Sequence, residues 1–236
     1  MITSASSRPA GFSDEDARAL GERAQNRLDQ LARVTDEPGQ VCRTYLSPAH
    51  ARSIDLVGSW MRTLGLTTRL DAVATLRGRR PADVAPETAK TLLIGSHIDT
   101  VIDAGKLDGC LGVIAAVLAV EEIERRGEKL PFAVEILAFG DEEGVRFPTA
   151  LSSSSAATGT YRREWLELRD RDGRRLVDAL ADFGCDADRI TEARIDPAGV
   201  LGYLEIHIEQ GPLLEHWGLP LGVVTSIAGQ SRFSFT

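Results

Sequence analysis

The segment from Thr91 to Glu124 constrains the fold of this chain more than any other. It contains an apolar run, a polar loop and a long apolar stretch with helical spacing, in the order TLLIGSHIDTVIDAGKLDGCLGVIAAVLAVEEIE. This order predicts a buried strand, a loop that carries His97, Asp99 and Asp108, and a helix over about 109–126. Ligands bind at the carboxyl ends of strands in open α/β sheets, so these side chains are candidates for a site.

A second apolar run, FAVEILAF at residues 132–139, predicts another buried strand. Strand, helix and strand in succession predict a right-handed βαβ unit with two parallel neighbours. Glu142 and Glu143 follow the second strand and therefore reach the same sheet edge as His97. Adjacent carboxylates point in different directions, so one is suited to bind a metal ion while the other moves a proton. A solvated acidic turn is the alternative interpretation.

The remaining elements are predicted from capping residues and periodicity. A helix is expected over about 14–34, capped by Ser13, and another from the Ser47 cap and Pro48 to a stop at Gly65. Alternation predicts a strand that places Glu205, His207 and Glu209 on one face. The other expected elements are a strand or hairpin over 66–76, a polar loop over 77–90, a short helix or a linker over 152–158, helical pieces over 174–183 and 187–191, a strand over 202–209, a short helix over 211–217 and strands over 221–227 and 232–236.

Composition narrows the class of partner. The chain has 236 residues, of which 43% are hydrophobic and 26% charged, as in ordinary globular proteins. Its net charge of -8 argues against nucleic acid and against an anionic membrane surface as main partners. Three widely spaced cysteines and the lack of a secretory pattern predict a reducing compartment, and we expect a cytoplasmic protein.

Four residues at or near predicted strand ends form a set with metal-binding chemistry: His97, Asp108, Glu143 and His207. Two imidazoles and two carboxylates suit zinc or manganese, and one carboxylate can bridge two ions. Each residue taken alone is better explained as a hydrogen-bonded or solvated side chain. The coincidence of four such residues at strand ends favours the metal site.

Three motifs in this order, GSHIDTVIDAGKLDGCLGV, AFGDEEGVRF and YLEIHIEQGPLLE, resemble the hydantoinase/carbamoylase family of amidohydrolases. That family belongs with the dinuclear metallohydrolases that include the aminoacylases and carboxypeptidase G. The resemblance implies a three-layer α/β/α catalytic domain with a mostly parallel central sheet, similar to the zinc exopeptidases. We place this domain at residues 13–228, after a flexible stretch at 1–12 and before the first strand of a lid and dimerisation domain at 229–236.

The resemblance also implies roles for individual residues. His97 and His207 would bind one metal ion, Asp108 would bridge two ions, and Glu143 would bind the second. The same resemblance implies that Glu142 is the general base and that Asp99 supports His97. It also implies that Gln210 and Arg232 bind the substrate. An arginine fork suits a substrate carboxylate.

The implied reaction is metal-assisted hydrolysis of a linear amide or ureido C–N bond. The implied substrate is allantoate or an N-carbamoyl-L-amino acid. An enzyme that acts on allantoate would belong to purine catabolism. An aminoacylase-type or peptidase-type relative is the alternative within the superfamily. The family continues beyond the position of Thr236 with the rest of a lid that forms homodimers and with a later histidine ligand. We therefore expect a truncated chain whose second metal site is incomplete, and a non-catalytic metal-binding fragment is the alternative function.

Overall fold

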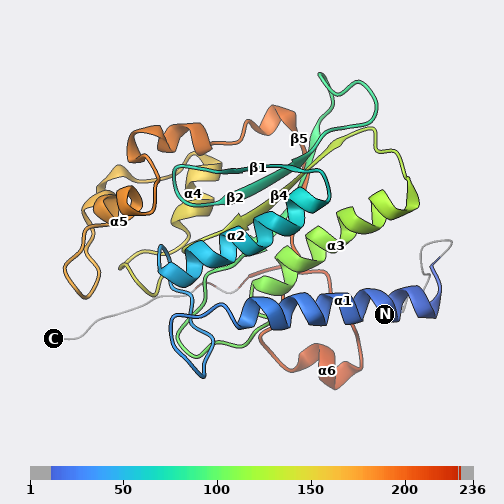
Figure 1. Ribbon diagram of the computed structural model, residues 1–236, viewed down its shortest axis with the longest axis horizontal. Helices are drawn as coiled ribbons and strands as arrows, with labels where there is room; N and C mark the ends of the chain where they lie inside the picture. Colours follow the sequence, from blue (N-terminus) through green and yellow to red (C-terminus); the bar gives the residue numbers. More distant parts are fainter. Residues whose placement is uncertain (1–11, 228, 230–236) are drawn as a thin grey trace.

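The computed structural model describes residues 12–227 and residue 229. The chain folds around a five-stranded sheet in the order β1-β2-β4-β3-β5 (Figure 1). The strands are β1 (Thr67–Leu70), β2 (Leu76–Arg80), β3 (Thr91–His97), β4 (Ala133–Phe139) and β5 (Val200–Leu204). The α-helices are α1 (Asp14–Ala32), α2 (Pro48–Thr63), α3 (Cys110–Arg126), α4 (Ser152–Thr158), α5 (Leu176–Asp182) and α6 (Leu213–Trp217). Short 3-10 helices are η1 (Arg163–Glu167), η2 (Ala187–Ala193) and η3 (Pro197–Gly199).

The centre of the sheet is parallel, and its geometry positions the site. β3 lies between β4 and β5 and is parallel to both, whereas β1 and β2 form an antiparallel hairpin that joins the edge of β4. In the register of β3 and β4, His97 is paired with Phe139, so both strands end at the same level. This confirms the predicted βαβ unit and the α/β class with a parallel central sheet.

Helices α1, α2 and α3 cover one face of this sheet (Figure 1). Alternate residues of β4, including Val134 and Ile136, pack with the apolar faces of these helices in the main core. Both predicted N-caps are present: Ser13 accepts a hydrogen bond from the amide of Asp16, and Ser47 from that of His50. These caps explain why the first two helices begin where the sequence predicts.

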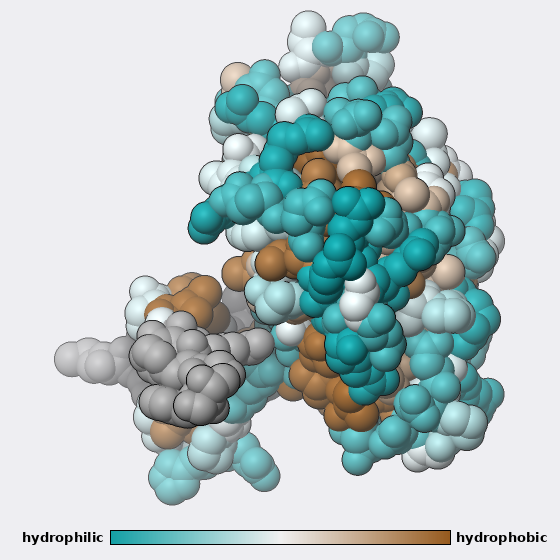
Figure 2. All heavy atoms as spheres, turned by 90° about the vertical axis from the view of Figure 1, so that its left-hand side faces the viewer, coloured by the Kyte–Doolittle hydropathy of each residue, from teal (hydrophilic) through white to brown (hydrophobic). Residues whose placement is uncertain are grey.

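The other face of the sheet carries α4 and a second core formed by α5 and the 3-10 helices. Residues 152–158 form α4, so the helix and not the linker is the correct alternative for this Ser/Ala-rich run. Helices on both faces give the three layers that the resemblance implies. None of the helices in the described part of the chain is long and apolar enough to cross a membrane. The surface on the side seen in Figure 2 is largely polar, with separate apolar patches.

The polar loop predicted over 77–90 is wrong at its beginning, where the structure contains β2. Three arginines in the run LRGRR favour a solvated loop by composition, but two of them are buried in the strand. Arg77 is only 3% exposed. Its Nε donates a hydrogen bond to Asp71 Oδ2 at 3.0 Å, which satisfies the buried charge inside the strand.

Two predictions in the C-terminal part are also wrong. The strand predicted over 202–209 ends at Leu204, and residues 205–209 have no regular secondary structure. Residues 221–227 form no strand and are exposed, because no neighbouring strand among the described residues pairs with their main-chain groups. The strand predicted over 232–236 lies outside the described residues, as do most of residues 1–12 and 229–236, which we had set apart as terminal segments.

Candidate metal centre

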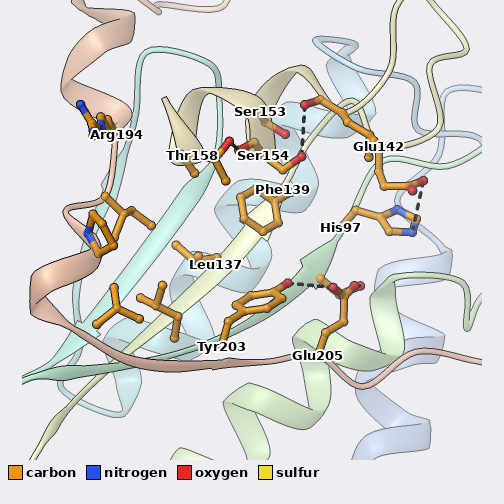
Figure 3. Close-up of a pocket in the computed structure, with 17 residues that line it drawn as sticks. His97, Leu137, Phe139, Glu142, Ser153, Ser154, Thr158, Arg194, Tyr203 and Glu205 are labelled. Carbon is orange, nitrogen blue, oxygen red and sulfur yellow. Dashed lines mark hydrogen bonds and ion pairs between the residues drawn. The ribbon is translucent and has the colours of Figure 1, made fainter. Parts of the chain in front are cut away.

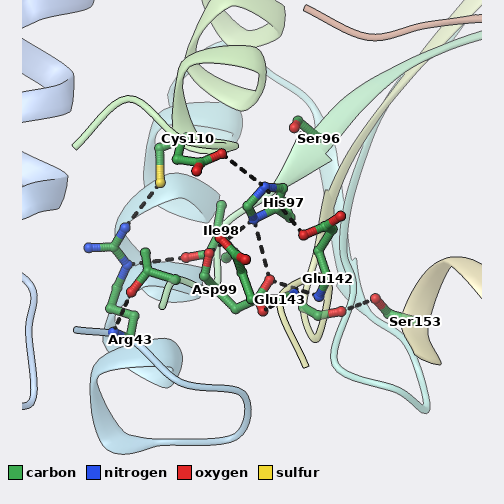
Figure 4. Close-up of polar contacts among 12 residues, drawn as sticks. Arg43, Ser96, His97, Ile98, Asp99, Cys110, Glu142, Glu143 and Ser153 are labelled. Atoms are coloured by element: carbon green, nitrogen blue, oxygen red, sulfur yellow. Dashed lines mark hydrogen bonds and ion pairs between the residues drawn. The ribbon is translucent and has the colours of Figure 1, made fainter. Parts of the chain in front are cut away.

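His97 is the last residue of β3 and lies at the centre of the candidate site. Its ring is almost fully buried, with 2% of the residue exposed. The Nδ1 atom lies 3.0 Å from the main-chain oxygen of Asp99 and 3.5 Å from Asp99 Oδ1. With the proton on Nδ1, this contact leaves the lone pair of Nε2 directed away from the sheet and available to a ligand (Figure 4).

Three side chains face this Nε2 atom. Asp108 Oδ1 lies 3.7 Å away, Glu142 Oε2 3.9 Å and His207 Nε2 3.5 Å. The two imidazole rings stand 5.7 Å apart, centroid to centroid, at an angle of 29°. The distance from His207 Nε2 to Asp108 Oδ1 is 3.2 Å. The structure therefore brings together four of the residues that the sequence analysis singled out.

Asp108 reaches this position through a turn that requires glycine. Gly109 has φ +63°, and a Cβ atom on it would lie 2.4 Å from His97 Nε2, so the turn can approach the ring only without a side chain. One oxygen of Asp108 accepts a hydrogen bond from Gln210 Nε2 at 2.8 Å. The other, Oδ1, is buried and has no hydrogen-bond partner among the described residues.

His207 enters the site by a route other than the predicted one. It lies in the irregular segment after β5, so Glu205, His207 and Glu209 do not share a strand face. Glu205 accepts a hydrogen bond from Ser96 at 2.7 Å, whereas Glu209 accepts from the main-chain amides that begin α6. The segment also passes so close to α3 that a Cβ on Gly112 would lie 2.2 Å from the main-chain oxygen of Ile206.

Asp99 connects the two loops of the site. Its carboxylate is 2% exposed and accepts hydrogen bonds from the main-chain amides of Glu142 and Glu143, both at 3.1 Å (Figure 4). The same carboxylate lies beside the ring of His97. One buried acid therefore fixes the loop after β4 relative to the loop after β3 and points Glu142 and Glu143 to the side of His97.

The protonation behaviour of the site reflects a surplus of negative charge. Burial lowers the pKa of His97, but the hydrogen bonds that its ring donates to Asp99 and the charges of Asp99 and Glu142 outweigh this effect and raise the pKa to about 9. Burial raises the pKa of Glu143, and the charges of Glu142, Asp108 and Asp99 raise it further against the opposing effect of His97. Both shifts are typical of a partly buried cluster of carboxylates around an imidazole.

The residues present fit a metal ion. His97, Asp108 and His207 each offer one ligand atom, and these three atoms lie within 4.8 Å of one another; the same holds for His97, Glu142 and Glu143. The unpartnered buried oxygen of Asp108 needs a cation or a donor at this point. Imidazole nitrogens with carboxylate oxygens suit a divalent transition metal.

Of the two residues predicted to bind the substrate, Gln210 and Arg232, only Gln210 lies within the described residues. Gln210 lies at the site, but its side-chain amide is bonded to Asp108. Arg232 lies outside the described residues. Beside the site, a pocket of about 690 Å³ extends along the face of the sheet opposite to α1–α3. Figure 3 shows that His97 and Glu142 lie at one end of this pocket and Arg194 at the other, with Leu137 and Phe139 on the floor.

The sequence analysis missed several residues that support the site. Tyr203 and Ser96 donate hydrogen bonds to Glu205 and hold the segment that leads to His207. Arg43 is buried behind the loop that carries Asp99. No periodicity marks these residues; the one available signal was a lone arginine, in VCRTY, among residues that predict burial.

A comparison with protein-family models finds a match to Peptidase family M20/M25/M40 over residues 93–228. This range contains every described residue of the candidate metal centre. Among solved structures, a hydantoinase/carbamoylase family amidase from Burkholderia ambifaria superimposes with a TM-score of 0.76 at 36% sequence identity. The superposition covers 84% of this chain and 48% of that chain.

Curated relatives are similar over most of this chain. Allantoate deiminase 1 of Glycine max is 44% identical over 221 residues, which are 92% of this chain and 45% of that protein. N-carbamoyl-L-amino acid amidohydrolase of Geobacillus stearothermophilus is 42% identical over 217 residues, which are 92% of this chain and 53% of that protein. The chain spans about half the length of the curated relatives it matches.

Proposed function

Since the chain belongs to Peptidase family M20/M25/M40, we propose that it forms the metal-binding part of an amidohydrolase that cleaves a linear C–N bond in a small ureido or amide substrate. The observation that carries the proposal is the convergence of His97, Asp108 and His207 around one point, with the buried Oδ1 of Asp108 unpartnered among the described residues. The names of the similar proteins, allantoate deiminase and N-carbamoyl-L-amino acid amidohydrolase, support this class of reaction.

In this proposal the ligand set holds two divalent ions, zinc or manganese. His97 and His207 would hold one ion, Asp108 would be shared between the two ions, and Glu143 would contribute to the second site, which is incomplete within the described residues. Bound ions of this kind polarise a carbonyl oxygen and lower the pKa of a water molecule. Asp99 holds the ring of His97 and the amides of Glu142 and Glu143 in place.

Glu142 is the proposed general base. Its side chain is 42% exposed, and its Oε2 lies 3.9 Å from His97 Nε2, at the edge of the ligand set. From there the carboxylate accepts a proton from an attacking water and returns it to the leaving nitrogen. Positioned acid–base groups of this type contribute roughly 10²–10⁴-fold to rate. Gln210 and Arg232 are proposed to contact the substrate, with Arg232 paired to a carboxylate, and a family homodimer is part of the same proposal.

Metal binding and turnover are measured separately to test the proposal. Calorimetric titration of the chain with manganese or zinc gives the affinity, and ammonia release from allantoate and from N-carbamoyl amino acids gives the activity. We expect His207→Ala to lose tight binding, while His216→Ala, a matched change at an exposed histidine of α6, keeps it. Equal affinity in these two variants would contradict the assigned ligand set.

The Glu142→Gln variant tests whether Glu142 acts as a general base or as a metal ligand. We expect it to keep metal affinity within about threefold and to lose most turnover, because the amide cannot accept the proton. A non-catalytic metal-binding protein, the second candidate, binds the metal tightly in the unsubstituted chain and releases no ammonia from either substrate. A chain that binds no metal at all contradicts both functions.

A further inference from the structure

Arg43 has the largest fully buried side chain in the described part of the molecule, with 1% of the residue exposed. It lies in the segment between α1 and α2, behind the metal-binding loop that joins β3 to α3. Among the described residues its guanidinium group forms no ion pair with a carboxylate. Burial of a charge without a counter-ion is unfavourable unless every donor finds an acceptor.

The acceptors of Arg43 come from three segments of the chain, and Figure 4 shows the bonds to Ile98 and Cys110. Its Nη1 donates to the main-chain oxygens of Leu31 and Val34 at the C-terminal end of α1, both at 3.1 Å. Its Nε donates to the oxygen of Ile98 at 3.2 Å, and its Nη2 to Cys110 Sγ at 3.0 Å. The helix end is a favourable place for a cation because its free carbonyls carry partial negative charge.

Two of these acceptors lie next to proposed metal ligands. Ile98 stands between His97 and Asp99, and Cys110 follows the Asp108-Gly109 turn. A single planar group therefore fixes both ends of the loop against the end of α1. The main chain of Arg43 adds two hydrogen bonds to the same loop: its amide donates to Thr100 Oγ1 at 2.9 Å, and its oxygen accepts from the Thr100 amide at 3.0 Å.

We propose that Arg43 is a positioning residue that holds the loop from Ile98 to Cys110 in the conformation in which its carboxylates meet His97 and His207. The role needs the planar fork of arginine, because the acceptors bond to three different nitrogens, Nε, Nη1 and Nη2. Lysine also has three N–H donors, but they share one nitrogen, which cannot lie within bonding distance of all these acceptors at once. The functional consequence rests on the proposed metal site, whereas the effect on the loop is measurable without metal.

The decisive variant is Arg43→Lys, which keeps the charge and removes the fork. In the metal-free chain we expect faster hydrogen exchange of the amides in residues 98–110, by about tenfold or more, and unchanged exchange in β4. For Co²⁺ or Mn²⁺ we expect the dissociation constant to rise about 10- to 100-fold, the usual effect of losing a supporting group, with an altered visible absorption spectrum of bound Co²⁺.

Arg77→Lys is the matched control. Arg77 is also buried, at 3% exposure, but it bonds to Asp71 and to the main chain of Ala193, away from the loop. We expect it to lower the melting temperature without changing loop exchange, metal affinity or the Co²⁺ spectrum. Wild-type exchange of residues 98–110 in Arg43→Lys, or the same loss of affinity in both arginine variants, overturns the proposal.

If Arg43→Lys does not fold, a smaller substitution tests the positioning role of Arg43. Thr100→Val keeps the arginine side chain and removes the hydroxyl that accepts the Arg43 amide and donates to the main-chain oxygen of Val101. We expect faster exchange confined to residues 98–110, and uniform or unchanged exchange contradicts the positioning role. If the unsubstituted chain binds no metal, the proposed function fails, while the exchange measurements still decide the role of Arg43.

Discussion

The Oδ1 atom of Asp108 lies 3.2 Å from Nε2 of His207, and it is buried without a hydrogen-bond partner among the described residues. The two residues lie far apart in the chain: Asp108 precedes α3, and His207 follows β5. An imidazole nitrogen and a carboxylate oxygen that face each other at this distance share a cation, either a proton or a metal ion.

Asp108→Asn is expected to remove the stabilisation that metal confers on the chain. A metal ion at 100 times its dissociation constant stabilises the folded state by about 2.7 kcal/mol. The amide is a weaker ligand without charge, so we expect the increase in melting temperature with added manganese or zinc to fall to a small fraction of the wild-type value. Asp103→Asn, at an exposed position in the same loop, serves as control and keeps the full increase. Equal increases in both variants would refute the assignment of Asp108.

Asp99→Asn is expected to loosen the site and to destabilise the chain. The carboxylate accepts hydrogen bonds from the amides of Glu142 and Glu143, but an asparagine presents one acceptor and one donor, so one amide is left facing an N–H group. Leaving a buried donor unsatisfied costs about 1–3 kcal/mol. Urea denaturation gives the loss of stability, and calorimetry is expected to show weaker metal binding. Unchanged affinity despite the expected destabilisation speaks against a supporting role for Asp99.

Gly112→Ala is expected to displace the segment that carries His207. A Cβ at this position lies 2.2 Å from the main-chain oxygen of Ile206 and 2.7 Å from Ser96 Cβ, so the backbone of the segment must move. The control is Gly21→Ala in α1, where no atom lies within 4 Å of the added Cβ. This change is expected to stabilise the chain by up to about 1 kcal/mol through helix propensity. Calorimetry then measures the metal affinity of both variants and of the unsubstituted chain. We expect the affinity to fall in Gly112→Ala and to stay unchanged in Gly21→Ala.

The pH dependence of stability is expected to reveal His50, which is fully buried. Burial lowers the pKa of His50 to about 4, against the smaller effect of the Asp99 charge. The unfolded chain binds a proton at its ordinary pKa near 6.5, whereas the folded chain does not until about pH 4. Stability from this residue is therefore complete above pH 6.5 and decreases by up to about 3 kcal/mol as the pH falls to 4.

Urea denaturation between pH 4 and 7.5 measures this decrease. His50→Gln removes the titrating group, and its amide oxygen replaces Nδ1 as acceptor for the Leu46 amide. We expect a flatter stability profile in this variant than in the wild type or in His216→Gln, which changes an exposed histidine. Parallel profiles for wild type and His50→Gln would show that His50 does not control the acid response.

The sequence predicted correctly those helices and strands whose ends are marked by local signals such as capping residues and glycines. The Ser13 and Ser47 caps, the Gly65 stop and the apolar runs of β3, α3 and β4 gave elements with correct types and nearly correct bounds. The prediction failed where a long-range partner decides the structure. β2 pairs with β1 and β4, and the buried carboxylate of Asp71 compensates the charge of Arg77 within it. The strand over 221–227 is absent because nothing in the described part of the chain pairs with it.

In the candidate site, too, local signals predicted some residues correctly, whereas long-range contacts decided the structure around His207. His97, Asp99, Asp108, Glu142 and Glu143 were identified from the sequence because each follows a strong strand signal, and parallel strands bring their carboxyl ends to one edge. His207 was selected with a wrong secondary structure: its alternating neighbours resemble a strand, but the Ser96–Glu205 hydrogen bond and the close passage over Gly112 hold an irregular segment there.

By itself, the sequence determined the order of strand, loop and helix and the chemical nature of the ligands, because capping, periodicity and side-chain chemistry are local properties of the chain. Only the tertiary structure decided that His207 meets Asp108, that Asp99 bonds to the loop after β4, and that Arg43 lies behind the loop that joins β3 to α3. These contacts join residues far apart in the chain, and their stability depends on burial and hydrogen-bond geometry that exist only once the layers have packed.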